Sequence, residues 1–380
     1  MSSLTGRPPD LCNLSLVKLI RHFYPYRFID LDSPKQLVSY DDRNYYFVAH
    51  LEDGDTSEFV FKMYNCLNNL PEVVCGVSAL MSHLHSRGFQ GTSQVTNRDG
   101  GTISMVTGQE LRRVVGVDCD VMDGYTYCIR VVRFVPGETM DAISKECITP
   151  TLLFEVGQFL GKIDTSLNDG FTNEAISTRV LANFDQMHFQ DMFPEFISSV
   201  EDPYRKKMAE QVFVEFTTHV APRIPTFKRG ILYNDAHTTN IIVQASKEQY
   251  KFAAFIDFDD AVNSCYLFEL AVLVTDVIAE FSNPQTNPFE LVSPLISGYS
   301  QEFELSKEEM GFLYYAVMAR CCQVAMVSEV QYKNEPWNDY LVSSIEPRWK
   351  VIELLLSTTK AEVDRIWSGA MGKSLNHYLS

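Results

Sequence analysis

The spacing of apolar residues changes once along this 380-residue chain, at Pro136-Gly137. Up to that point, short segments rich in β-branched and aromatic residues predict strands, and two of them, 45–51 and 57–64, flank a turn-forming segment at 52–55. Beyond it, apolar residues recur mostly at helical spacing. Because 380 residues exceed one ordinary core, we predict an α+β fold with a strand-rich lobe at residues 1–135 and a helix-rich lobe at residues 136–380.

The same periodicities predict the individual elements. In the first lobe we expect further strands at 36–41, 101–106, 112–118 and 125–135, and helices at 10–24 and 70–88. In the second lobe we expect short strands at 230–233, 241–243 and 252–256, and long helices near 203–221, 267–281, 307–328 and 345–368.

The acidic character of the chain excludes some classes of partner. Asp and Glu outnumber Lys and Arg by 49 to 32, which gives a net charge of −17. This charge repels nucleic acid and attracts cationic or amine-bearing ligands. No stretch reaches the roughly 18 uncharged apolar residues of a membrane span, and the N-terminus lacks the apolar core of a secretory signal. The nine cysteines include no C-x-x-C pair and indicate reduced thiols. We therefore expect a cytoplasmic protein without nucleic-acid or membrane partners.

Lys62 is the first candidate functional residue. Alternation along the segment 59–63 places Phe59, Phe61 and Met63 on one face of a strand and Lys62 on the other. An inward lysine is costly to bury unless it meets an anion, and in a phosphoryl-transfer enzyme that anion is the phosphate tail of the nucleotide. Glu72, near the start of the next helix, is the candidate carboxylate that would hold the lysine in position. A lysine whose charged end reaches the surface is the alternative.

Asp235 and Asn240 form the second candidate set. A predicted strand delivers Asp235 into a loop, and Asn240 follows five positions later, just before another strand. This D-x-x-x-x-N spacing is typical of a kinase catalytic loop, in which the carboxylate accepts the proton of the attacking hydroxyl and the amide oxygen coordinates a metal ion. Taken alone the spacing is a weak signal, because Asp and Asn are common in turns.

Asp257, at the end of a buried strand, is the third candidate. Mg²⁺ is usually held by one or two carboxylates plus phosphate oxygens, and Asp257 supplies one. Asp259 and Asp260 follow, and three acids in four residues would repel one another without a cation, which favours a metal site over a plain acidic turn. The three segments occur in the order that a protein-kinase-like fold requires, with a nucleotide-binding lobe at residues 1–135 and a catalytic, substrate-binding lobe at residues 136–380.

With these motifs the chain resembles the aminoglycoside phosphotransferase and choline kinase branch of the kinase-like fold, and within it the hydroxylysine kinases. The resemblance covers nearly the whole chain. Besides the Lys62, 235–240 and 256–258 segments, it rests on residues 39–45, 133–137, 153–157, 160–164, 264–271, 320–323 and Trp349.

The resemblance implies transfer of the γ-phosphoryl group of GTP (or of ATP) to the hydroxyl of 5-hydroxylysine, with Mg²⁺ as cofactor, in the cytosol. Asp235 would accept the proton, and Asn240 and Asp257 would hold Mg²⁺. Lys62, steadied by Glu72, would bind the phosphates. The turn 39–45, through its backbone or Asn44, would cover the phosphates, and the backbone of residues 132–135, including Arg133 and Phe134, would meet the base.

The chain departs from the H-G-D-x-x-x-x-N and D-F-G-D motifs of this branch. Tyr233 stands at the histidine, Asn234 at the glycine before Asp235, and Asp259 at the glycine after Asp257. Every atom that performs the chemistry is still present, so we expect an active enzyme. A catalytically silent nucleotide-binding protein is the alternative from another class. Within the enzymes, the alternative acceptors are an aminoglycoside-like compound, choline, ethanolamine or homoserine.

Three residues are candidates for binding the acceptor. His237, inside the loop, and Asp260 could reach an amine-bearing substrate, and Arg320 could bind an α-carboxylate by a bidentate contact. For Arg320, an internal ion pair with Glu269 is the equally weighted alternative. We expect Glu269 itself to brace the catalytic loop.

Overall fold

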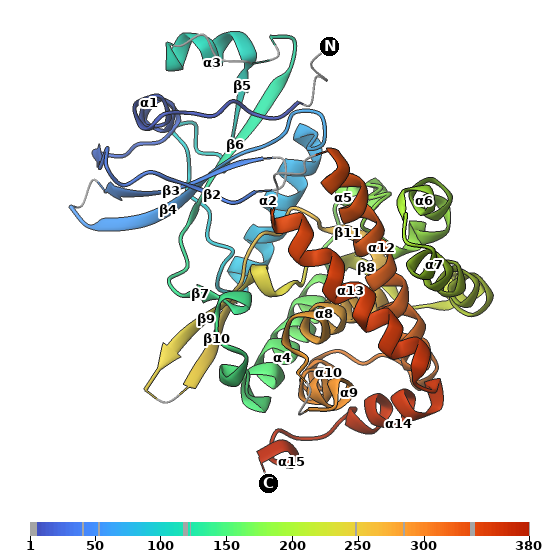
Figure 1. Cartoon of the computed structure of the whole chain (residues 1–380). Coiled ribbons are helices and arrows are strands. Elements are labelled where there is room, and N and C mark those ends of the chain that lie inside the picture. Colours follow the sequence, from blue (N-terminus) through green and yellow to red (C-terminus); the bar gives the residue numbers. More distant parts are fainter. Residues whose placement is uncertain are drawn as a thin grey trace. The chain divides into compact units, whose positions relative to one another are not determined.

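The computed structural model describes residues 6–39, 42–51, 54–116, 121, 123–247, 249–283, 286–334 and 339–379. The chain divides into two compact units (Figure 1). Unit 1 comprises Met1–Pro136 with Asn173–Ala175, and unit 2 comprises Gly137–Thr172 with Ile176–Ser380. Each unit is described separately below.

Unit 1 is built on a six-stranded antiparallel sheet with the order β1-β3-β4-β6-β5, in which β2 also pairs with β3. Its strands are β1 (Phe28–Ile29), β2 (Lys35–Leu37), β3 (Arg43–His50), β4 (Thr56–Met63), β5 (Ile103–Thr107) and β6 (Thr126–Arg133). Side chains alternate along β4 as predicted: Phe59, Phe61 and Met63 belong to the main hydrophobic core of the unit, and Lys62 lies on the opposite face.

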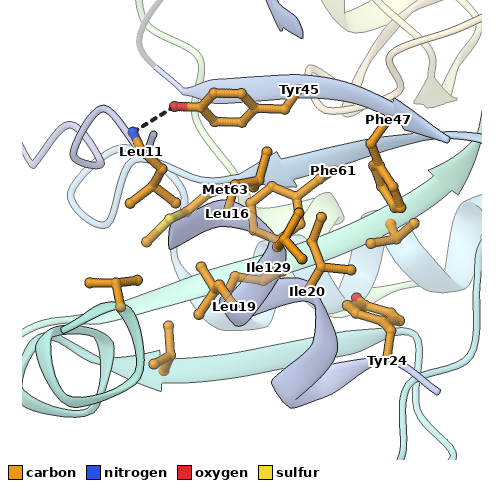
Figure 2. Close-up of a cluster of buried hydrophobic side chains, with 14 of the residues drawn as sticks. Leu11, Leu16, Leu19, Ile20, Tyr24, Tyr45, Phe47, Phe61, Met63 and Ile129 are labelled. Carbon is orange, nitrogen blue, oxygen red and sulfur yellow. Dashed lines mark hydrogen bonds between the residues drawn. The ribbon is translucent and has the colours of Figure 1, made fainter. Parts of the chain in front are cut away.

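Three helices complete unit 1: α1 (Asn13–Phe23), α2 (Pro71–Ser86) and α3 (Gly108–Val115). Figure 2 shows α1 lying across the sheet, with Leu16, Leu19 and Ile20 packed among side chains of β3, β4 and β6. The N–H of Leu11, just before the helix, donates a hydrogen bond to the Tyr45 hydroxyl (3.0 Å). Helix α1 thus covers the hydrophobic core on the face of the sheet opposite Lys62.

The strand predicted at 112–118 is wrong for residues 112–115, and residues 117 and 118 lie outside the described residues. Residues 108–115 form α3, although Val114 and Val115 favour a strand locally. The Thr107 hydroxyl caps the first turn by accepting a hydrogen bond from the N–H of Glu110, and Gly116 ends the helix in the left-handed conformation (φ 70°). The two helix caps therefore outweigh the strand preference of Val114 and Val115 in this segment.

Unit 2 contains two small antiparallel sheets, which pair as β10-β9-β7 and β11-β8. The strands are β7 (Glu138–Thr139), β8 (Arg229–Leu232), β9 (Ile241–Ser246), β10 (Gln249–Phe255) and β11 (Val262–Cys265). The predicted strands at 230–233, 241–243 and 252–256 correspond to β8, β9 and β10, and they carry the loop and the turn that contain the acidic candidates.

Helices make up the rest of unit 2. The longer ones are α4 (Pro150–Asn168), α6 (Phe189–Phe196), α7 (Pro203–Glu215), α8 (Tyr266–Phe281), α10 (Ser293–Glu302), α12 (Leu313–Asn334), α13 (Asp339–Ser357) and α14 (Lys360–Ala370), and the short ones are α9 (Pro288–Leu291), α11 (Lys307–Met310) and α15 (Asn376–Leu379). The short helix α5 (Glu174–Thr178) begins in the segment Asn173–Ala175 of unit 1 and ends in unit 2. Short segments of other helical types are η1 (Met140–Ala142), η2 (Lys145–Cys147), η3 (Gln186–His188), η4 (Ile197–Ser199), η5 (Phe216–Val220), η6 (Ala221–Thr226) and η7 (Thr238–Asn240).

Two glycines allow α4 and α10 to cross at close range. A Cβ atom on Gly157 would lie 2.0 Å from the carbonyl oxygen of Leu295, and one on Gly298 would lie 2.1 Å from that of Phe154. Any side chain at either position would therefore push the two helices apart. Among the helices of the described residues, none is both long and apolar enough to span a membrane.

Candidate active site

Two strand ladders in unit 2 hold the predicted catalytic loop beside the acidic turn. Leu232 pairs with Val262 in the β8–β11 ladder, and Ile241 pairs with Phe255 in the β9–β10 ladder. The loop 233–240 and the turn 256–261 therefore begin and end next to each other, although more than 20 residues separate Asp235 from Asp257. This pairing places Asp235, Asn240, Asp257 and Asp260 in one region of the unit.

Both carboxylate oxygens of Asp235 have partners inside the loop. The side-chain Nδ2 of Asn240 donates a hydrogen bond to Asp235 Oδ2 (2.6 Å), and His237 Nε2 lies 2.8 Å from Oδ1. Burial raises the pKa of Asp235 well above its usual range, and the charges of Asp260 and Asp257 raise it further, while Arg320 and the Asn240 bond oppose the shift. A raised pKa makes the deprotonated carboxylate a stronger base than an ordinary aspartate.

The orientation of Asn240 suits a metal ligand. Its Nδ2 also donates to the main-chain oxygen of Asp235 (3.2 Å), and within the described residues no hydrogen bond to its amide oxygen is recorded. The donor end of the amide is thus occupied and the acceptor end is left for a cation. Among the described residues no group of three or more His, Cys, Asp or Glu could hold a metal by itself. An amide, one carboxylate and phosphate oxygens remain a suitable set for Mg²⁺.

Two candidate positions adopt left-handed backbone conformations that are rare outside glycine. These are Asn234 (φ 64°) and Asp257 (φ 60°), and they are the non-glycine residues of the described chain with positive φ. The N–H of Asn234 donates a hydrogen bond to Glu269 Oε2 (2.7 Å), which confirms that Glu269 braces the loop. Asparagine tolerates this conformation better than other non-glycine residues. Asn234 therefore preserves the turn for which the related motif uses glycine.

Tyr233 supplies a brace at the position of the motif's histidine. Its hydroxyl donates a hydrogen bond to the carbonyl oxygen of Ile256, and the N–H of Ile256 donates to the carbonyl oxygen of Asn240 (3.0 Å). The residue before Asp257 is thus tied to the catalytic loop through both of its backbone groups. The tyrosine ring is fully buried against Phe255 and Phe258.

A buried ion-pair network supports the loop from behind. Asp276 on α8 accepts hydrogen bonds from the N–H (2.6 Å) and the hydroxyl (2.8 Å) of Thr238. Arg348 on α13 pairs with Asp276 and with Glu280 (2.8 Å). Burial alone would raise the pKa of Asp276, but His237, Arg348 and the Thr238 bonds outweigh it and lower the pKa to about 2. We did not predict Asp276 or Arg348, although an acid inside the most apolar helix of the chain is a usable signal.

Arg320 is buried, with 3% of its surface exposed, and its charge acts on Asp235. Its Nη1 donates hydrogen bonds to the carbonyl oxygen of Phe184 (2.6 Å) and to Gln323 Oε1 (2.9 Å). The alternative ion pair with Glu269 is not formed: Glu269 Oε2 is bound to Asn234, and Oε1 has no hydrogen-bond partner within the described residues. The charge of Arg320 lowers the pKa of Asp235, and its contact with a substrate carboxylate stays a prediction.

A second buried acid, Asp164, lies close enough to Glu269 for the charge of Glu269 to shift its pKa. Asp164 on α4 is fully buried, accepts a hydrogen bond from the Tyr299 hydroxyl (2.6 Å) and has no partner for Oδ1 within the described residues. Burial and the charge of Glu269 raise the pKa of Asp164 well above its usual range. Burial also raises the pKa of Glu269 to about 7, against the Asn234 bond and the Arg320 charge.

These raised pKa values predict that the free energy of unfolding falls as pH rises. Glu269 is protonated in the folded state from its ordinary value of 4.5 up to about 7, whereas the unfolded chain has already lost this proton. The stability is therefore present below pH 4.5 and lost as pH rises toward 7, by at most about 3 kcal/mol for this group. Urea unfolding at pH 5 and pH 8 should show a smaller decrease for Glu269→Gln than for wild type. An equal decrease in both proteins would contradict the assignment.

In unit 1, Lys62 lies in a row of polar residues across three strands. Its exposed fraction is 6%, and it pairs in register with Asn44 on β3 and Arg130 on β6. Residues directly opposite each other in antiparallel strands share a face. Lys62 Nζ and the Arg130 guanidinium lie 5.7 and 5.3 Å from the centre of the Tyr64 ring. Arg130, which is 1% exposed, is a second cation on this face that we did not predict from the sequence.

The other predicted nucleotide-binding residues occupy different positions in unit 1. Asn44 lies within β3 and is buried, and the turn expected before it includes residues 40 and 41, which lie outside the described residues. Glu72 is exposed in the first turn of α2. The N–H groups of Arg133 and Phe134 donate to the carbonyl oxygens of Ser93 (2.9 Å) and Glu58 (3.0 Å). The roles of all four stay predictions.

Unit 1 contains an antiparallel sheet, and unit 2 is mainly helical and carries a D-x-x-x-x-N loop. Together these features are typical of kinase-like phosphoryl-transfer proteins. The sequence profile of the phosphotransferase enzyme family (APH) matches residues 35–299. The chain belongs to this family, and the predicted α+β kinase-like fold and phosphotransferase class are confirmed.

Individual relatives agree with this assignment. The chain is 24% identical to hydroxylysine kinase of Xenopus laevis over 97% of its own length and 96% of the relative's, and 26% identical to hydroxylysine kinase of Danio rerio over 94% and 95%. Among solved structures, it is similar to amicoumacin kinase hAmiN in complex with AMP-PNP, Ca²⁺ and Ami. The TM-score is 0.67 at 14% identity, covering 92% of this chain and 96% of the other. The predicted resemblance to hydroxylysine kinase is thereby confirmed.

Proposed function

We propose that this phosphotransferase transfers the γ-phosphoryl group of GTP to the side-chain hydroxyl of 5-hydroxylysine, giving 5-phosphohydroxylysine. The observation that carries the proposal is the arrangement of Asp235, with its raised pKa, beside Asn240 and the Asp257 turn. The names of the two relatives, which match nearly the whole chain, support the acceptor. The donor GTP rests on the resemblance to hydroxylysine kinases, with ATP as the alternative.

Each site residue has a defined task in this proposal. Asp235 accepts the proton of the attacking hydroxyl. The amide oxygen of Asn240 and the carboxylate of Asp257 hold Mg²⁺, which neutralises charge on the phosphates when it is bound. His237 Nε2, at hydrogen-bond distance from Asp235, keeps the carboxylate oriented, and the charge of Arg320 favours its deprotonated form.

Unit 1 has the task of holding the nucleotide. Lys62, which pairs in register with Asn44, is assigned to the phosphates, and Glu72 is assigned to hold the lysine in position. The base is assigned to the backbone of residues 132–135. Because the N–H groups of Arg133 and Phe134 are already engaged, the carbonyl groups of this segment and the N–H of Val135 are the groups proposed to meet it. The cytosol is the proposed location, and the eight cysteines of the described residues, all free thiols, support it.

A catalytically silent nucleotide-binding protein is the second candidate, favoured by Tyr233, Asn234 and Asp259. The bonds of Tyr233 to Ile256 and of Asn234 to Glu269 argue against it, because they maintain the loop and the turn. Another amine alcohol as the acceptor is the alternative within the enzymes.

Turnover of Mg-GTP and Mg-ATP with a panel of hydroxy amines tests the proposal. The panel comprises 5-hydroxylysine, homoserine, choline, ethanolamine and an aminoglycoside, and the product is followed by phosphorus NMR. We expect 5-hydroxylysine to give the highest kcat/KM, with GTP preferred. Preference for another acceptor would contradict the substrate, and nucleotide binding without turnover on any acceptor would favour the silent protein.

A further inference from the structure

Arg179, which directly follows α5, contacts the acidic turn from a distant part of the sequence. Its Nη1 donates hydrogen bonds to the carbonyl oxygens of Asp259 and Ala261 (3.3 Å for the latter). These two carbonyl groups flank Asp260, whose charge acts on both Asp235 and Arg320. Arg179 therefore contacts the turn that contains Asp260, the residue predicted to reach the amine-bearing acceptor.

The remaining donors of Arg179 are available. A guanidinium group has five N–H donors, and the two on Nη1 are directed at the two carbonyl groups. For Nε and Nη2 the structure records no hydrogen bond or ion pair within the described residues, and the side chain is half-buried. The Nε–Nη2 edge presents two parallel donors, which is the arrangement that binds a carboxylate in bidentate fashion.

Arg320 is less accessible to a substrate than Arg179. It is 3% exposed, and its Nη1 is used for Phe184 and Gln323. Of these two arginines near Asp260, only Arg179 combines partial exposure with a fixed guanidinium plane and an open edge. The anchoring on backbone carbonyl groups also lowers the entropy that the side chain would lose on binding a ligand.

We propose that Arg179 binds the α-carboxylate of the acceptor, so that this site selects amino acids over amines without a carboxylate. The inference rests on the proposed function and narrows its substrate class. An α-ammonium group at Asp260 and an α-carboxylate at Arg179 occupy neighbouring positions on one turn, as the zwitterionic end of an amino acid requires. The side-chain hydroxyl of the same molecule is then assigned to Asp235.

The test compares 5-hydroxylysine with the hydroxy diamine that lacks only the α-carboxylate. Wild type, Arg179→Met and the control Arg223→Met are assayed for turnover with Mg-GTP and, separately, for acceptor binding by calorimetry with a non-hydrolysable GTP analogue. Arg223 is also an arginine of unit 2, exposed and paired with Glu308 at 3.8 Å. We expect Arg179→Met to raise the KM and Kd for 5-hydroxylysine at least about 10-fold. The values for the diamine should change less than about threefold, and kcat should change little for either.

Other outcomes separate the inference from the proposed function. Equal losses for both acceptors in Arg179→Met would mean that the arginine only clamps the turn, and this overturns the inference. The inference is also overturned if the wild-type protein binds both acceptors equally well, or if it binds neither of them. If wild type binds both without turnover but Arg179→Met loses only the carboxylate preference, the proposed function fails and the carboxylate site stands.

Discussion

Replacement of Asp235 by asparagine should reduce the rate of phosphoryl transfer by about 10²–10⁴-fold, the usual loss when a general base is removed. The substitution keeps the size of the side chain, and its amide oxygen can still accept the hydrogen bond from Asn240 Nδ2. What it removes is the ability to take a proton from the acceptor hydroxyl. Because Asp235 is not assigned to the nucleotide, the affinity for GTP should stay within about threefold of wild type.

Single-turnover kinetics and nucleotide titration check this prediction together. Asp191→Asn is the matched control, because the Asp191 side chain on α6 is 82% exposed and has no part in the loop. Its rate should equal that of wild type. If Asp235→Asn kept more than about a tenth of the wild-type rate, proton transfer to Asp235 would not be part of the rate-limiting chemistry.

Replacement of Arg348 by methionine should lower the free energy of unfolding by about 3–5 kcal/mol, the typical cost of removing one partner of a buried ion pair. The substitution leaves Asp276 and Glu280 without their cation, and both Arg348 and Asp276 are less than a tenth exposed. Asp276 holds both hydrogen-bonding groups of Thr238, so the catalytic rate should fall as well.

Urea unfolding measures the loss, with Arg223→Met as the control. The Arg223–Glu308 pair is exposed, so breaking it should cost less than about 1 kcal/mol. In the double variant Arg348→Met with Asp276→Asn, the loss should be smaller than the sum of the single losses, because no uncompensated charge then remains at position 276. Additive losses would show that the pair is not coupled. If Arg348→Met does not fold, Arg348→Lys offers a milder version of the same comparison.

The sequence predicts those parts of the candidate site that are close along the chain. Asp235 and Asn240 are five positions apart in one loop, and they are hydrogen-bonded in the structure. Asp257 is more distant, and the predicted strands 241–243 and 252–256, which pair as β9 and β10, bring only one side of its turn to the loop. The strand on its other side, β11, pairs with β8 and was not predicted.

The unpredicted residues are those whose partners are far away in sequence. Arg179 meets residues 80 and 82 positions further on, and Arg348 lies 72 positions from Asp276. A single sequence carries no signal for such contacts, because hydrophobic periodicity specifies which face of an element is buried but not which element covers it. For Arg320 the sequence left a substrate carboxylate and an ion pair with Glu269 equally weighted, and the partners in the structure are Phe184 and Gln323.

Helix ends were predicted less well than helix positions. The expected helix 307–328 is α11 followed by α12, and the expected helix 345–368 is α13 followed by α14. A Ser306–Glu309 capping box starts α11, and Gly311 follows its last residue. Thr358 and Thr359 separate α13 from α14. The apolar spacing continues across both interruptions, so periodicity alone does not reveal them.

The left-handed turn at Asn234 affects how divergent members of this enzyme family should be interpreted. A sequence that lacks the motif's glycine is easily classed as a pseudoenzyme, yet an asparagine with its N–H bound to a buried glutamate gives the same backbone shape. The informative comparison is therefore between positions 234 and 269 taken as a pair, because the brace at Asn234 depends on the side chain of Glu269. An asparagine accompanied by its acidic partner is compatible with an intact loop, whereas the same asparagine without that partner indicates a loop that has lost its support.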